Sequence, residues 1–170
     1  MSLEQFALAQ HITRRCMKTT RMTLTLALCL AGVGVCFAGD ANMGTWKLNE
    51  AKSKSSPGAT KNTTVVYEPA GDQVKVTTDG TSGDGAPAHS EWTGKFDGKD
   101  YPVSGDPSAD TRAYKKVDEH TLLLTNKKNG KVPTSGRIVV SGDGRSRTVT
   151  VTGTSAEGKT MSSSAVYDKQ

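Results

Sequence analysis

Residues 63–78 read TTVVYEPAGDQVKVTT, two runs in which apolar and polar side chains alternate on either side of a short glycine-containing segment. Val65 and Tyr67 share one face of the first run, and Val74 and Val76 share one face of the second. Alternation with a period of two places the apolar side chains on one face of a β-strand. The Ala-Gly-Asp sequence between the runs is typical of a tight turn, so this stretch predicts an antiparallel hairpin.

The same pattern continues along most of the chain. Turn sequences such as Asp97-Gly98 and Asn129-Gly130 recur every 10–15 residues, and Val, Thr and Tyr dominate the runs between them. The alternation predicts strands at 43–49, 62–69, 73–79, 87–96, 100–104, 111–117, 120–127, 131–140, 145–153 and 160–168. The only helix expected is a short one at 51–55, which the following Ser-Pro-Gly would end.

These segments predict an all-β fold. None of the connections is long enough for a parallel crossover, so the strands form an antiparallel up-and-down meander. A meander removes its exposed edges by closing into a barrel. We expect about ten strands, or eight if two of the hairpins are irregular.

The N-terminal stretch has a different character. Lys18 and Arg21 precede an apolar run from Met22 to Ala38 that ends in small residues. This order is typical of a secretory signal peptide with cleavage before Gly39, and a retained membrane anchor is the alternative. The expected organisation is an N-terminal extension plus signal peptide over 1–38 and a single barrel domain over 39–170. The apolar part is short for a membrane span.

Charge and cysteine content agree with export. Cys16, Cys29 and Cys36 all lie in the presequence, so the mature chain has no cysteine for a disulfide or a thiolate metal site. Removal of residues 1–38 also lowers the net charge from +5 to +2, because four basic residues and one acidic residue are lost. The mature chain has no basic patch interleaved with aromatics, so nucleic acid is not an expected partner. We expect a periplasmic or secreted protein with no transmembrane anchor after processing.

Two short stretches carry a family resemblance. Gly44-Thr45-Trp46-Lys47-Leu48-Asn49 opens the mature domain, and Ala165-Val166-Tyr167-Asp168-Lys169-Gln170 closes it. The chain resembles a family of small exported bacterial lipocalin-like β-barrel proteins and, more distantly, the fatty-acid-binding proteins. The resemblance implies a ten-stranded barrel that carries a small ligand. In those families the tryptophan plugs one end of the barrel, which implies a structural role for Gly44 and Trp46.

The sequence also departs from those families. Only the residues Glu50–Asn62 join the first two expected strands, which is too few for the helix pair of fatty-acid-binding proteins. Those proteins hold a carboxylate with an arginine two positions before the terminal tyrosine, and that position is Ala165 here, so only Tyr167 of the pair remains. Lipocalins pair the opening tryptophan with a late arginine. The last strand here has no arginine, and Lys169 is the nearest substitute.

No residue pattern indicates catalysis. His89 and His120 are the two histidines of the mature chain, and neither has a neighbouring ligand at metal-binding spacing. His89 and Glu91 alternate on one face of an expected strand, where a solvated outer face is favoured over a catalytic pair. The chain has neither a Gly-x-Ser-x-Gly elbow nor a Walker-type phosphate loop. We therefore expect no enzyme activity, no metal and no cofactor.

If the barrel has a cavity, aromatic side chains should line it. The candidate ligand-binding residues are Trp92, Phe96, Arg112, Tyr114 and Tyr167. Arg112 shares a face with Tyr114 and would pair with an anionic head group, although an outward orientation of Arg112 and Arg137 is favoured. The sequence thus predicts an exported, monomeric, non-enzymatic barrel for a small apolar or amphipathic ligand. The alternative is a structural or interaction protein of the cell envelope whose rings simply fill the core.

Overall fold

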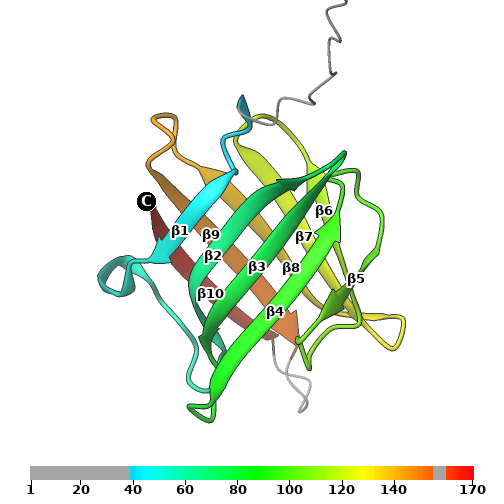
Figure 1. Ribbon diagram of the computed structural model, residues 1–170. Helices are drawn as coiled ribbons and strands as arrows, with labels where there is room; N and C mark the ends of the chain where they lie inside the picture. Colours follow the sequence, from blue (N-terminus) through cyan, green and yellow to red (C-terminus); the bar gives the residue numbers. More distant parts are fainter. Residues whose placement is uncertain (1–38, 155–159) are drawn as a thin grey trace, which may run out of the picture. The chain divides into compact units, whose positions relative to one another are not determined.

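A computed structural model describes residues 39–154 and 160–170, which form a closed barrel of ten antiparallel strands (Figure 1). The strands are β1 (Gly44–Leu48), β2 (Lys61–Ala70), β3 (Gln73–Thr81), β4 (Pro87–Gly94), β5 (Tyr101–Ser104), β6 (Thr111–Lys116), β7 (Thr121–Lys128), β8 (Lys131–Val140), β9 (Ser146–Thr154) and β10 (Thr160–Lys169). A single turn of 3-10 helix, η2 (Glu50–Lys52), follows β1. The predicted all-β barrel of ten strands is confirmed.

The barrel closes through its first strand. Every strand pairs with the next one along the chain, and β1 also pairs with β10. Trp46 lies opposite Val65 of β2 on one side and opposite Lys169 of β10 on the other. Because β1 is bonded along both edges, neither β2 nor β10 is left as an open edge at this position.

The turns follow from local sequence. Between β7 and β8, Asn129 and Gly130 have φ angles of 50° and 73°. Two consecutive residues with positive φ make a primed turn, whose twist matches that of the flanking strands. Asn and Gly are the residues that accept this backbone most readily.

Two expected elements differ from the structure. The helix expected at 51–55 is instead the shorter η2, and the Asn49 side chain accepts a hydrogen bond from Lys52 N at 3.2 Å. The fourth strand ends at Gly94 rather than at residue 96. Beyond it the chain turns to pair with the end of β6, where the Phe96 carbonyl accepts from Lys116 N at 3.0 Å. Asp97 also forms a bridge with Lys115, so the residues after β4 pair with β6 beyond the Tyr101–Arg112 pair of β5.

The two ends of the barrel differ. The closed end carries the segment Gly39–Met43 and the turns after β2, β4, β6 and β8, and the open end carries the β1–β2 connection and the turns after β3, β5 and β7. The β3–β4 turn is at the lower edge of Figure 1. The buried apolar core consists of Trp46, Val65, Tyr67, Val74, Val76, Trp92, Tyr114, Leu122, Leu124, Ile138, Val140 and Tyr167.

The N-terminal segment of the domain packs under Trp46. Trp46 is completely buried, and its Nε1 donates to the carbonyl of Asn42 at 2.8 Å. Asn42 is also fully buried, and its backbone N and its Nδ2 each donate to Asp40 Oδ1 at 3.0 Å. Asp40 Oδ2 pairs with Lys116 Nζ at 2.7 Å, which ties the segment to β6. The segment and the indole together close this end.

We expect Trp46→Ala to lower the free energy of unfolding by about 3–5 kcal/mol, the usual cost of truncating a large buried aromatic. The loss combines the apolar area of the indole, the cavity left behind and the broken bond to Asn42. Urea unfolding followed by circular dichroism measures the change. A shift below about 1 kcal/mol would show that the indole does not support the closed end.

Asp40 should make the stability depend on pH. Burial opposes ionisation of its carboxyl, but hydrogen bonds from Lys116 and Asn42 outweigh that effect and lower the pKa below the ordinary 3.8. A depressed pKa adds stability that is present above the ordinary pKa and lost as pH falls through the folded-state value. Asp40→Asn should therefore destabilise the protein near pH 7 and have a smaller effect near pH 2. Equal losses at the two pH values, measured by urea unfolding, would exclude the carboxylate charge as the cause.

Candidate ligand-binding site

A buried arginine lies at the closed end among three aromatic rings. The side chain of Arg147 on β9 is 2% exposed, and its guanidinium carbon lies 4.7 Å from the Trp46 ring, 4.8 Å from Tyr67 and 4.9 Å from Tyr167. Sequence reasoning missed this residue. The available signal was its position two residues before Val149, on the inward face of the ninth strand. Trp46 therefore contacts an arginine of β9 as well as Lys169 of β10, whose Nζ lies 5.1 Å from the ring centroid.

Aromatic faces take the place of a counter-ion for Arg147. Within the described part of the chain no carboxylate pairs with it, and its Nε and Nη1 have no hydrogen-bond partner. Burial raises the pKa of the Tyr67 hydroxyl far above its ordinary value, Tyr114 adds to the shift, and the Arg147 charge only partly opposes it. The phenol therefore stays protonated, and the cation is stabilised by the ring quadrupoles. We assign this cluster a structural role.

Three of the five sequence-predicted ligand residues meet toward the closed end of the barrel. The ring centroids of Trp92 and Tyr114 are 4.8 Å apart, and that of Phe96 lies 6.4 Å from Trp92 and 5.8 Å from Tyr114. Tyr67 joins them, 6.2 Å from Tyr114. Trp92 and Tyr114 are almost fully buried and pack edge to face against each other. Tyr167 lies apart, under Arg147, and its hydroxyl donates to the Asn62 carbonyl at 3.0 Å.

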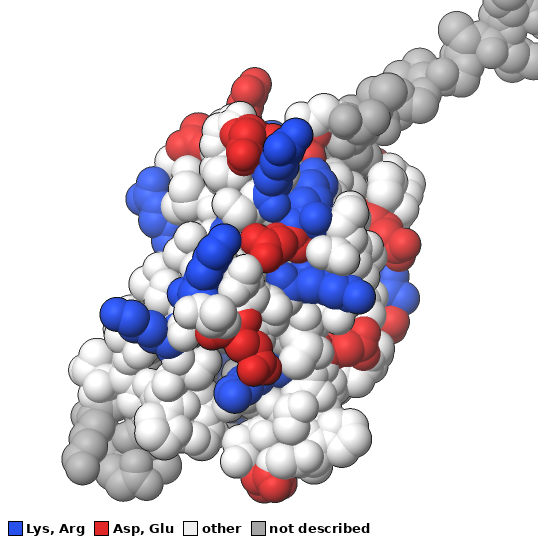
Figure 2. Space-filling view, turned by 90° about the vertical axis from the view of Figure 1, so that its left-hand side faces the viewer, with Lys and Arg blue, Asp and Glu red and all other residues white. Residues whose placement is uncertain are grey.

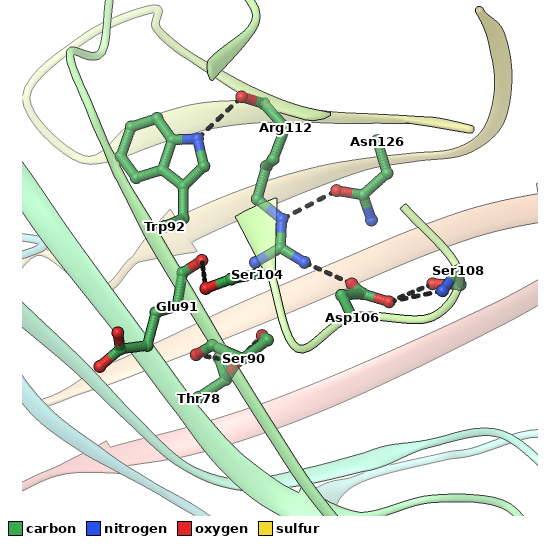
Figure 3. A network of polar contacts seen from close by, with 9 residues as sticks. All are labelled: Thr78, Ser90, Glu91, Trp92, Ser104, Asp106, Ser108, Arg112 and Asn126. Atoms are coloured by element: carbon green, nitrogen blue, oxygen red, sulfur yellow. Dashed lines mark hydrogen bonds and ion pairs between the residues drawn. The ribbon is translucent and has the colours of Figure 1, made fainter. Parts of the chain in front are cut away.

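The remaining predicted residue, Arg112, points inwards. Its side chain is only 9% exposed, Nε donates to Asn126 Oδ1 at 2.8 Å, and Nη2 pairs with Asp106 Oδ2 at 2.8 Å (Figure 3). The backbone carbonyl of Arg112 accepts from Trp92 Nε1 at 2.8 Å. The favoured outward orientation is therefore wrong for Arg112, because Asp106 and Asn126 satisfy its charge inside the barrel. Arg137 is exposed, as expected.

Arg112 belongs to a larger polar surface toward the open end. Thr78 and Ser90 lie opposite each other on β3 and β4, are both buried, and are joined through their hydroxyls. Asn126 lies opposite Arg112 on β7 and is 8% exposed. Figure 3 shows the Thr78–Ser90 pair in the same region as the Arg112 guanidinium. We call Thr78, Ser90, Arg112 and Asn126 the polar wall.

Small side chains line β8, β9 and β10 toward the open end. Gly136, Val149, Val151, Ser163 and Ala165 continue the inward-facing registers of their strands, and they are only half-buried. In contrast, Ile138 and Val140 further along β8 are 2% exposed. We interpret the partial exposure of the inward-facing Val149, Val151, Ser163 and Ala165 side chains as access of water to the barrel interior. Gly136 also borders a hollow on the outer face, beside Arg137 and Thr150. We call these five residues the small-residue wall and the interior beside them the lumen.

A hollow of about 660 Å³ lies at the rim of the open end. The β1–β2 connection, the start of β2 and the β3–β4 turn form it, and the turn approaches so closely that a Cβ on Gly83 would lie 2.0 Å from the Gly58 carbonyl. Leu48 contributes an inward-facing apolar side chain, and serine and threonine hydroxyls make up much of the rest. Glu50 and Lys61 are its two charged lining residues, so the lining of the hollow has no net charge.

The outer surface has mixed charge. Figure 2 shows acidic and basic side chains interspersed over one face, without a large area of one sign. Many form ion pairs, such as Lys75 with Glu91 at 2.6 Å. His89 is exposed on the outer face of β4, 2.7 Å from Asp79, in agreement with the solvated face expected for it. Nowhere in residues 39–154 and 160–170 do three His, Cys, Asp or Glu side chains come together as a metal site.

In the described part of the chain, no helix has the length and apolar character needed to cross a membrane.

No family model matches the sequence, and no curated protein matches it either. Among solved structures, the chain is similar to a redesigned β-barrel, mFAP1, bound to DFHBI. That structure is 17% identical, the match covers 78% of this chain and 98% of the other, and the TM-score is 0.41. A second match is EF1p2_mFAP2b bound to DFHBI, at 14% identity, 76% and 94% coverage and a TM-score of 0.44.

The two inward arginines should differ in their effect on stability. Arg112→Met leaves the Asp106 carboxylate without its cation, so we expect a loss of about 3 kcal/mol. Arg147→Met leaves no acid behind and retains apolar contact with the rings, so we expect a loss below about 1.5 kcal/mol. Urea unfolding near pH 7 compares the two. A larger loss for Arg147→Met would mean that the cation–aromatic contacts outweigh the cost of burying the charge.

Proposed function

We propose that the protein is a monomeric, non-enzymatic barrel that binds a small, partly apolar ligand through its open end. The observation that supports this most strongly is the partial exposure of the small-residue wall. Side chains as small as Gly136, Ser163 and Ala165 do not fill a ten-stranded barrel, so they leave accessible space opposite the polar wall.

The chemistry of the lumen supports an amphipathic ligand. The Trp92 and Tyr114 rings give the lumen an aromatic base, and Val149 and Val151 give it an aliphatic side. The polar wall across from them supplies hydroxyls and a guanidinium. Binding sites of this kind are mostly apolar, with a few placed polar groups that fix the orientation of the ligand. An apolar body with one polar group fits this arrangement.

The positions of the histidines favour binding over catalysis. His89 is on the outer face, and His120 lies in the turn between β6 and β7 at the closed end. General acid–base catalysis needs a titratable group within hydrogen-bond reach of a substrate. In the described lumen the ionisable pair is Arg112 with Asp106, and these two residues are engaged with each other.

A second candidate function is a structural or interaction role in the cell envelope. The packed rings of the closed half and the exposed apolar side chains Val117, Leu123, Val132 and Val139 favour it. A barrel with that role has no need to bind small molecules. The two functions are therefore separated by a binding measurement.

We also propose export with cleavage before Gly39. Asp40 and Asn42 are held by the barrel through Lys116 and Trp46, so the folded domain needs the chain from about this point onward. Cleavage at the expected site leaves these contacts intact. Cleavage a few residues later would remove the cover of Trp46.

Ser163→Trp should block the lumen. Its new ring would lie on the inward, half-buried side of β10, so we expect the affinity for the neutral fluorescent probe N-phenyl-1-naphthylamine to fall by about tenfold or more. Ser162→Trp, on the exposed side of the same strand, is the matched control and should leave the affinity unchanged. Fluorescence titration measures both variants. Lack of probe binding to the wild-type protein would favour the envelope role.

Edman sequencing of the exported protein should begin at Gly39. The expected mature chain retains Asp40 and Asn42, and with them the contacts to Lys116 and Trp46. An exported protein that still begins at Met1 would contradict the processing.

A further inference from the structure

Asp106 forms an ion pair with the Arg112 guanidinium. The carboxylate belongs to the loop after β5, and its Oδ2 lies 2.8 Å from Arg112 Nη2. Its other oxygen accepts from Ser108 N at 2.9 Å and from Ser108 Oγ at 2.6 Å. Both oxygens are therefore engaged, and the side chain is only 16% exposed. The loop thus holds an acid against the inward-facing cation (Figure 3).

This arrangement changes which ligand head group the lumen accepts. Arg112 Nε is taken by Asn126 and Nη2 by Asp106, and a ligand carboxylate or sulfonate would have to displace a fixed acid or lie beside it. Within the described residues Nη1 makes no hydrogen bond, and it can still donate to a carbonyl or hydroxyl oxygen. Like charges brought together in a poorly solvated site repel strongly.

We propose that Asp106 is a specificity-determining residue that makes the lumen select neutral ligands over anionic ligands of the same shape. The proposal rests on the proposed binding function. It assigns the polar head group to the class of neutral hydrogen-bond acceptors, such as an amide, ketone or alcohol. It also replaces the anionic head group that the sequence alone predicts for Arg112.

The second inward cation does not offer an anion site to a ligand in the lumen. Arg147 is enclosed by Trp46, Tyr67 and Tyr167 at the closed end, and its Nε and Nη1 are inaccessible. Its charge acts on a ligand only across these rings. The paired Arg112 is therefore the cation that a ligand meets.

Two dyes with a common aromatic body test the selectivity. N-phenyl-1-naphthylamine is neutral, and 8-anilinonaphthalene-1-sulfonate adds one negative charge. We expect the wild-type chain to bind the neutral dye about tenfold more tightly or better. Asp106→Asn should strengthen binding of the sulfonate about tenfold and change binding of the neutral dye little, because the variant frees the Arg112 charge.

Asp110→Asn is the matched control. Asp110 lies in the same loop and pairs with Lys128 at 2.7 Å, but both side chains are well exposed outside the lumen. This variant removes the same charge and should leave the ratio of the two affinities unchanged. The double variant Asp106→Asn/Arg112→Gln replaces the pair by neutral side chains of similar size, and it should return the sulfonate affinity to about the wild-type level. It also provides a folded reference if the unpaired arginine destabilises the single variant.

Three results would overturn the inference. They are a wild-type preference for the sulfonate dye, an equal effect of Asp106→Asn and Asp110→Asn on the affinity ratio, or a double variant that binds the sulfonate as strongly as the single variant. If neither dye binds to the wild-type chain, the proposed function itself fails, and the selectivity fails with it.

Discussion

Strand β1 is only five residues long, and the barrel closes because both of its edges are bonded. Without this strand the sheet would have two unpaired edges, at β2 and β10. Closure also fixes which face of each strand is inside, since a slip of one residue would exchange the two faces. Trp46 therefore enters the interior at a fixed position, where its indole nitrogen donates to the Asn42 carbonyl and the Arg147 guanidinium lies over its ring.

The interior divides according to the size of the residues that face it. Trp46, Tyr67, Trp92 and Tyr114 meet toward the closed end and leave little space. Toward the open end most inward positions of β8–β10 carry glycine, serine, alanine, threonine or valine, which are too small to meet across ten strands, and Met161 of β10 is the one long side chain among them in the described residues. The same fold thus has one half packed with large rings and one half lined mainly by small side chains, and the proposed binding function rests on the second half.

Much of the fold follows from local pattern. The alternation of Val65 with Tyr67 and of Val74 with Val76 predicts the strands and their inward faces, and turn sequences such as Asn129-Gly130 predict the hairpins. These signals are local, so one sequence suffices to find them. The end of β4 was harder to predict, because Phe96 leaves the strand only to pair with a segment of β6 that follows later in the chain.

The charged residues of the interior depend on distant partners, and alternation alone does not identify them. Arg112 is inside because Asp106 on a loop and Asn126 on the next strand satisfy its charge. Arg147 is inside because rings from β1, β2 and β10 surround it. A general preference for exposed arginine therefore gives the wrong orientation for Arg112, although it gives the right one for Arg137.

The central claim is that water enters the barrel from the open end and stops at the aromatic rings. Nuclear Overhauser effects between water and methyl groups in the free protein test this claim directly. The account predicts effects at Val149, Val151 and Ala165, which line the lumen, and none at Val74 and Val76, which are 1% exposed in the packed core. Absence of the effect at all five residues would contradict an accessible lumen and indicate a barrel filled by its own side chains.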